Sequence, residues 1–128
     1  MSMRALSFFV ALLALGGPIL TVTAEEEEPV HISVVRLIAT PDAFDGRHVI
    51  AEGLAVIGFE ADAIYVSKET AEHGSLVNDV GLVLDRERDF GHLHLKWVIV
   101  DGTFKKDRES SPRRAGRIVD VVNIFAVD

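Results

Sequence analysis

Cysteine is missing from this chain of 128 residues. The absence excludes disulfide bonds, thiol catalysis, thiolate metal sites and a lipidated N-terminal Cys, so packing alone must hold a folded domain together. Motifs of catalysis are missing as well: there is no Gly-x-Ser-x-Gly elbow, no phosphate-cradling glycine loop and no His-Glu-x-x-His. We therefore predict a protein that is not an enzyme and that needs no cofactor.

Basic and aromatic residues are scarce. The chain has 13 Lys and Arg residues against 20 Asp and Glu, a formal net charge of −7, and only 7% of its residues are aromatic. A negative net charge repels nucleic acid at long range, so nucleic acid is an unlikely partner on this composition. Most aromatic residues alternate with apolar neighbours and are assigned to the core. Only Tyr65 and Trp97, which carry a polar group, are expected at a surface.

An export signal is the clearest feature that is present, at residues 1–24. Arg4 gives a positive start, residues 5–22 are uncharged and mostly apolar, and small residues precede an acidic run. The apolar stretch is nearly long enough to cross a bilayer, so a retained anchor is the alternative. Gly and Pro at 16–18 interrupt its helical character. We predict cleavage after Ala24, giving a periplasmic or secreted bacterial protein with no membrane span.

The remaining residues are enough for one domain. We expect a charged leader at 25–32 and the domain at 33–128. Helical spacing at 30–40, with Ser33 as its cap and Pro41 as its end, predicts a short N-terminal helix. The period then changes to two, which is typical of strands. Strands are expected at 47–59, 63–67, 80–84, 97–104 and 117–127, with a short helix at 68–73 that ends at Gly74 and a basic loop at 105–116.

Two of the expected strands share a short motif. Residues 49–53 and 98–102 both follow the pattern Val-Ile-x-acid-Gly, which places Gly53 and Gly102 well inside a strand. Glycine at such a position normally costs packing and backbone entropy. It is explained if both strands bend sharply, as strands in a small closed barrel must. We therefore predict a mainly β protein, built as a small five-stranded barrel and not as a flat sheet.

A longer pattern runs between about Val34 and Ile124. Its residues are Leu37, Pro41, Phe44, Asp45-Gly46, Val49, Gly53, Ile64-Tyr65-Val66, Glu72-His73-Gly74 and Val98-x-Val100-x-Gly102-x-Phe104. In these residues the chain resembles a group of small exported bacterial proteins of unknown function with an oligonucleotide/oligosaccharide-binding (OB) fold. The resemblance implies an OB-like barrel and brings no catalytic residue with it. One difference is that an ordinary OB barrel has its helix between strands three and four, whereas the clearer helix here precedes the third strand.

The five histidines raise the possibility of a metal site. His92 and His94 are two residues apart, so on a strand they would point to the same face, and His48 or His73 could supply a third nitrogen. No spacing fixes that third ligand. The alternative, which we favour, is two half-exposed histidines at the entry to the fourth strand. A metal- or haem-handling periplasmic protein using His92 and His94 is the second functional hypothesis.

Basic residues are concentrated between positions 105 and 117, where Asp107 and Glu109 dilute them. The loop between strands four and five flanks the binding face of OB barrels, and guanidinium groups bind phosphate or carboxylate through two hydrogen bonds. A local anion- or partner-binding site is one interpretation, and a solvated loop is the other. The basic residues concerned are Lys105, Lys106, Arg108, Arg113, Arg114 and Arg117.

Glu52 and Asp101 would be neighbours if the two motif strands pair, and a close carboxylate pair can share a proton. A hydrolase acting through them is the weakest hypothesis, because such residues more often lie on the solvent face of an antiparallel sheet. The favoured hypothesis is an exported, non-catalytic binding or interaction module of the bacterial envelope. Its expected partner is an envelope protein or a small anionic or glycan ligand.

Overall fold

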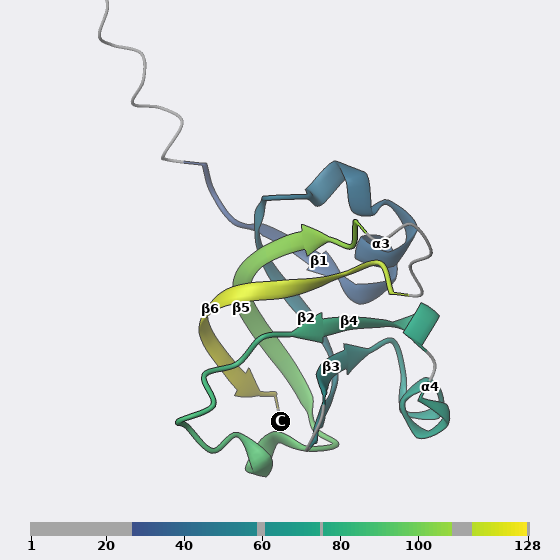
Figure 1. Ribbon diagram of the computed structural model, residues 1–128, viewed down its shortest axis with the longest axis vertical. Helices are drawn as coiled ribbons and strands as arrows, with labels where there is room; N and C mark the ends of the chain where they lie inside the picture. Colours follow the sequence, from purple (N-terminus) through teal and green to yellow (C-terminus); the bar gives the residue numbers. More distant parts are fainter. Residues whose placement is uncertain (1–26, 59–60, 75, 109–113, 128) are drawn as a thin grey trace, which may run out of the picture.

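The computed structural model describes residues 27–58, 61–74, 76–108 and 114–127 (Figure 1). The predicted export signal, Phe59 and Arg113 lie outside these residues. Within the described part of the chain, every helix is too short or too polar to cross a bilayer.

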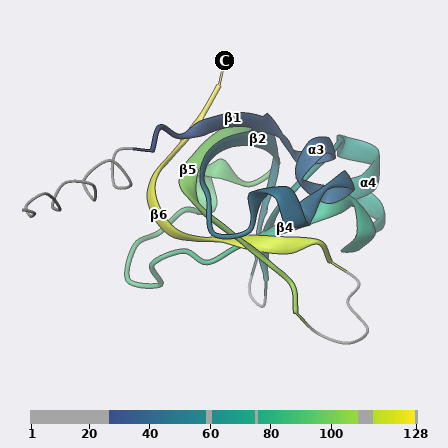
Figure 2. The same cartoon turned by 90° about the horizontal axis from the view of Figure 1, so that it is seen from above.

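Five strands close into a barrel. Neighbours around it follow the order β2-β3-β4-β6-β5, and β5 then pairs with β2 to complete the circle (Figures 1 and 2). The β4–β6 contact is parallel and consists of two residue pairs, while the other barrel contacts are antiparallel. This arrangement confirms the mainly β, five-stranded OB-like barrel. The strands are β2 (His48–Ile57), β3 (Asp62–Tyr65), β4 (Asp79–Leu82), β5 (Trp97–Lys106) and β6 (Gly116–Ala126).

A sixth strand, β1 (Val30–Ser33), pairs in parallel with the start of β2, and helix α3 (Val34–Ala39) follows it. The prediction of a helix from residue 30 is therefore wrong at its start, and residues expected in the charged leader belong to the sheet. Ile32 is buried between the more exposed His31 and Ser33, which is the alternation of a strand. Ser33 does cap the helix, because its Oγ accepts the backbone N–H of Arg36 at 3.2 Å.

The inter-strand helix is confirmed as α4 (Lys68–His73), which ends at Gly74 in the left-handed conformation (φ 63°). Between β4 and β5, where an ordinary OB barrel has its helix, this chain has only the short 3₁₀ turn η6 (Gly91–Leu93). Two further 3₁₀ turns are η4 (Pro41–Phe44), which follows α3, and η5 (Leu76–Asn78), which precedes β4. Helical structure therefore surrounds the barrel only in short segments.

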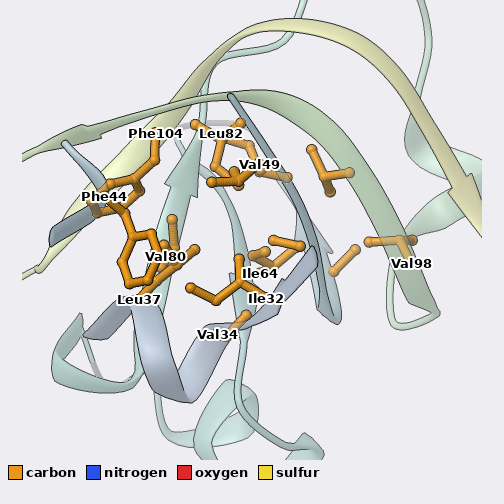
Figure 3. Close-up of a cluster of buried hydrophobic side chains, with 14 of the residues drawn as sticks. Ile32, Val34, Leu37, Phe44, Val49, Ile64, Val80, Leu82, Val98 and Phe104 are labelled. Atoms are coloured by element: carbon orange, nitrogen blue, oxygen red, sulfur yellow. The ribbon is translucent and has the colours of Figure 1, made fainter. Parts of the chain in front are cut away.

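The barrel interior is filled by the alternate side chains of each strand (Figure 3). In β2, Val49, Ala51 and Ala55 are fully buried, as the period of two predicts. Val34 and Leu37 of α3 project into the same cluster, so the helix belongs to the core. Other members are Phe44, Ile64, Val80, Leu82, Phe90, Leu93, Val98, Val100, Phe104 and Ile118.

The two motif strands pair directly with each other, with Val49 opposite Gly102 and Gly53 opposite Val98. A Cβ on Gly53 would lie 2.8 Å from the carbonyl oxygen of Tyr65, and one on Gly102 would lie 2.8 Å from the carbonyl oxygen of Val119. Opposite Gly102 the register of β5 and β6 shifts, which marks a bulge. Both glycines therefore allow backbones to approach more closely than any side chain would permit.

Candidate functional site

The predicted histidine pair does not lie on a strand. His92 is part of η6 and His94 is its C-terminal cap, so the same-face argument for a metal site does not hold. His94 Nδ1 accepts the backbone N–H of Ile57 at 3.1 Å, and His48 Nε2 lies 2.5 Å from Oδ1 of Asp101. No group of three or more His, Cys, Asp and Glu side chains within the described ranges could hold a metal ion. The part of the chain that the structure describes therefore supplies no third ligand to His92 and His94.

Two of the predicted anion-binding residues hold the β5–β6 connection to η4. Lys106 Nζ donates to Asp42 at 2.6 Å, and Arg108 Nη2 donates to Asp45 at 2.5 Å. The backbone N–H of Lys106 also donates to Asp45, and this bond is the main reason that the pKa of Asp45 is lowered; Arg108 lowers it further. Lys106 and Arg108 are thus already paired with carboxylates of the same molecule. Lys105 remains exposed on β5.

A buried ion pair uses Arg114. Its Nε and Nη2 donate to the two oxygens of Asp79, at 2.7 and 2.9 Å, and Asp79 is fully buried. Tyr65, expected at a surface, is 6% exposed and bonds to Asp79, so that expectation is wrong. Burial, followed by the charge of Asp79, raises the pKa of Tyr65, while the bond to Asp79 raises that of Arg114. The buried hydroxyl group of Tyr65 thus has a hydrogen-bonding partner, Asp79, on another strand.

An open groove of about 560 Å³ lies on the outer face of β1, β2, β5 and β6. The strand register builds it, because it places the outward side chains of neighbouring strands side by side. Glu52 lies opposite Ile99, which in turn lies opposite Phe125; Ile50 lies opposite Asp101. We call this site the outer groove. Its floor is apolar and carries a few polar groups, as ligand sites in proteins commonly do.

Two aromatic side chains border the outer groove. Trp97 is 38% exposed and Phe125 is 46% exposed, and Val35 of α3 adds a third exposed apolar side chain. Trp97 was expected at a surface, but Phe125 was assigned to the core, and that assignment is wrong. Both faces of β6 are rich in apolar residues, so alternation does not tell which of them points inward. Exposed aromatic residues that gather in one concavity are typical of a binding surface.

The carboxylates of the outer groove are each bound to a neighbour. Trp97 Nε1 donates to Oε1 of Glu52 at 2.8 Å, and His48 holds Asp101. Glu52 and Asp101 lie on the same face, as predicted, but they are not opposite each other in the register. The arrangement gives the indole and both carboxylates hydrogen-bonding partners, and it places the two carboxylates diagonally across the β2–β5 pair.

The fold and the outer groove define a class: a small β-barrel with an aromatic-bordered groove on its outer surface. Comparison with protein-family models and with curated proteins finds no match to this sequence. The residues of the outer groove are therefore the basis on which a function can be assigned.

Proposed function

We propose that this protein is a non-catalytic binding module of the bacterial envelope and that its ligand occupies the outer groove. The observation that carries the proposal is the exposure of Trp97 and Phe125 in the lining of a mostly apolar concavity of about 560 Å³. Aromatic side chains provide large, rigid contact area at low entropic cost. The carboxylates support binding over catalysis, because Glu52 and Asp101 are each held by a separate partner.

An uncharged glycan is the ligand class that fits this groove best. The flat faces of Trp97 and Phe125 suit the apolar faces of sugar rings, while Glu52, Asp101 and Asn123 offer oxygens that accept hydrogen bonds from hydroxyl groups. The same carboxylates repel an anionic ligand. OB barrels bind oligosaccharides, although usually on the face of strands two and three, so the groove itself and not the fold is the basis for this choice.

Export is part of the proposal and is supported by the signal pattern at residues 1–24. We expect the mature protein to begin at Glu25 and to be recovered in the soluble envelope fraction. N-terminal sequencing of the protein from its own host tests this. A chain that still begins at Met1 or Ser2 in the membrane fraction would contradict it.

Binding is tested by fluorescence, because Trp97 is the single tryptophan of the chain and lies in the groove. We expect a saturable change in its emission when a neutral β-1,4-linked oligosaccharide of N-acetylglucosamine is added. Phe125→Ala keeps the reporter and removes one stacking surface, so affinity should fall about tenfold. Val122→Ala is the matched control, since Val122 lies on the same strand, is 72% exposed and does not line the groove.

Three results would overturn the proposal that a neutral glycan occupies the outer groove. Saturation with polygalacturonate but not with the neutral oligosaccharide would show that the groove selects anions. Absence of any saturable change with neutral oligosaccharides would instead favour an envelope protein as the occupant. An equal loss of affinity in Phe125→Ala and Val122→Ala would place the binding site elsewhere.

A further inference from the structure

A second, smaller pocket of about 220 Å³ lies between β3, β4, the start of β6 and the segment after β4. It shares no lining residue with the outer groove. Three arginines, Arg86, Arg114 and Arg117, line it together with Asp62. We call it the arginine pocket. Three arginines at one pocket are notable in a chain whose net charge is −7.

Arg114 is fixed in position before any ligand arrives. Its Nε and Nη2 are bound by buried Asp79, so Nη1 forms the edge of the guanidinium that faces away from that carboxylate. A Cβ on Gly81 would lie 3.0 Å from this Nη1 and 3.3 Å from Cβ of Arg117. The bare backbone of Gly81 thus lets the guanidinium lie against β4 at the wall of the pocket. A donor held in this way loses little conformational freedom on binding.

Arg86 and Arg117 supply positive charge that is not paired with a carboxylate of the described residues. Both side chains are exposed, and neither has a carboxylate within ion-pair distance among the residues that the structure describes. Asp62 is the one opposing carboxylate in the lining, and its Oδ1 accepts the backbone N–H of Gly58 at 3.0 Å. If Asp79, which is paired to Arg114, is counted with the lining residues, three arginines face two aspartates, an excess of one positive charge. The pocket therefore favours an anion.

We propose that the arginine pocket binds a small oxyanion of the phosphate class. Guanidinium groups bind tetrahedral oxyanions through paired N–H donors, which distinguishes them from the point charge of lysine. Arg86 follows β4, Arg114 precedes β6 and Arg117 lies in β6, and all three line this one pocket. This site is independent of the outer groove and of the glycan proposed there.

The test is a titration of the whole purified protein with sodium phosphate, compared with sodium chloride at the same ionic strength. Two-dimensional proton–nitrogen NMR of the arginine side chains reports each guanidinium separately. We expect saturable shifts at Arg86, Arg114 and Arg117 with phosphate and not with chloride. The double variant Arg86→Gln/Arg117→Gln should bind phosphate at least about tenfold more weakly, because two charged donors are lost.

Lys68→Gln is the control, since Lys68 is exposed on α4, lies outside the pocket lining and loses the same charge as a single Arg→Gln change. It should leave phosphate affinity unchanged. Asp62→Asn should strengthen binding severalfold by removing the opposing charge. All the altered side chains are outside the barrel core, so the variants should keep the parental melting curve. Shifts that rise without saturation, that are equal in chloride, or that persist in the double variant would overturn the proposal.

Discussion

Replacing glycine by alanine at positions chosen by distance gives the sharpest test of the barrel packing. A Cβ at Gly116 would lie 2.3 Å from the carbonyl oxygen of Lys105 and 2.6 Å from Cζ of Phe104. At Gly102 the two shortest distances are 2.6 Å to a side chain and 2.8 Å to a backbone oxygen, and at Gly53 both are 2.8 Å. At Gly58 the shortest distance is 3.4 Å, which is an ordinary contact.

The expected losses of unfolding free energy follow these distances. Overpacking a well-packed core costs about 1–3 kcal/mol. We therefore expect about 3 kcal/mol for Gly116→Ala, where the close atoms are backbone and a buried ring. Gly102→Ala and Gly53→Ala should cost about 1–2 kcal/mol, because part of each clash is with a side-chain methyl group that can move. Gly58→Ala should be neutral or stabilise by up to about 1 kcal/mol, since it reduces the freedom of the unfolded chain.

Urea denaturation gives these values directly, and thermal melting provides a second measure. A change of 1 kcal/mol shifts Tm by about 4–8 °C in a domain of about 100 residues, so the series should be well resolved. Equal m-values are required, to show that the variants unfold from the same compact state. If Gly102→Ala and Gly53→Ala were as stable as Gly58→Ala, the strands could separate at these points, and the argument that the glycines close the barrel would be refuted.

Three further changes test individual side chains. Asp79→Asn should lower the unfolding free energy by about 2 kcal/mol, because Arg114 loses its buried partner but retains some access to water; an unchanged urea midpoint would contradict this. The pKa of Tyr65 should lie above its ordinary value of 10.0 in the folded protein, so the unfolded chain releases this proton first and the free energy of unfolding falls as pH rises past 10. Tyr65→Phe should reduce this loss of stability at alkaline pH, and the absorbance of the phenol group follows the titration. His92→Ala/His94→Ala should not alter bound zinc or copper, measured by elemental analysis, and loss of about one equivalent would revive the metal hypothesis.

Much of the barrel could be predicted from local pattern. The helix at 68–73 is marked by a capping serine and a terminal glycine, and both signals lie within the segment itself. Strand β1 was missed because its four residues are too few for a reliable period. Its pairing with β2 also depends on residues about 19 positions away, such as Val49 opposite Val30. A short strand of this kind is specified by its partner more than by its own sequence.

The candidate sites were predictable only in part, for a related reason. The pattern placed Glu52 on the outer face, and the structure puts it in the groove beside Trp97. It could not show that Lys106 and Arg108 are held by carboxylates more than 60 positions earlier in the chain. A run of basic residues thus indicates charge but not whether that charge is free. Exposure of Phe125 likewise follows from its register with Ile99.

The contact between β4 and β6 consists of two residue pairs, which is fewer than any other strand pairing in the barrel. The barrel should therefore open first at this contact. Gly81 and Leu82 pair there with Arg117 and Ile118, so few backbone hydrogen bonds must break for the two strands to separate. Amide protons beside this contact should therefore exchange with solvent through local opening, whose free energy is well below that of global unfolding. The ion pair between Asp79 of β4 and Arg114, which precedes β6, lies beside this contact. Side chains therefore hold the two segments together where the backbone pairing is shortest.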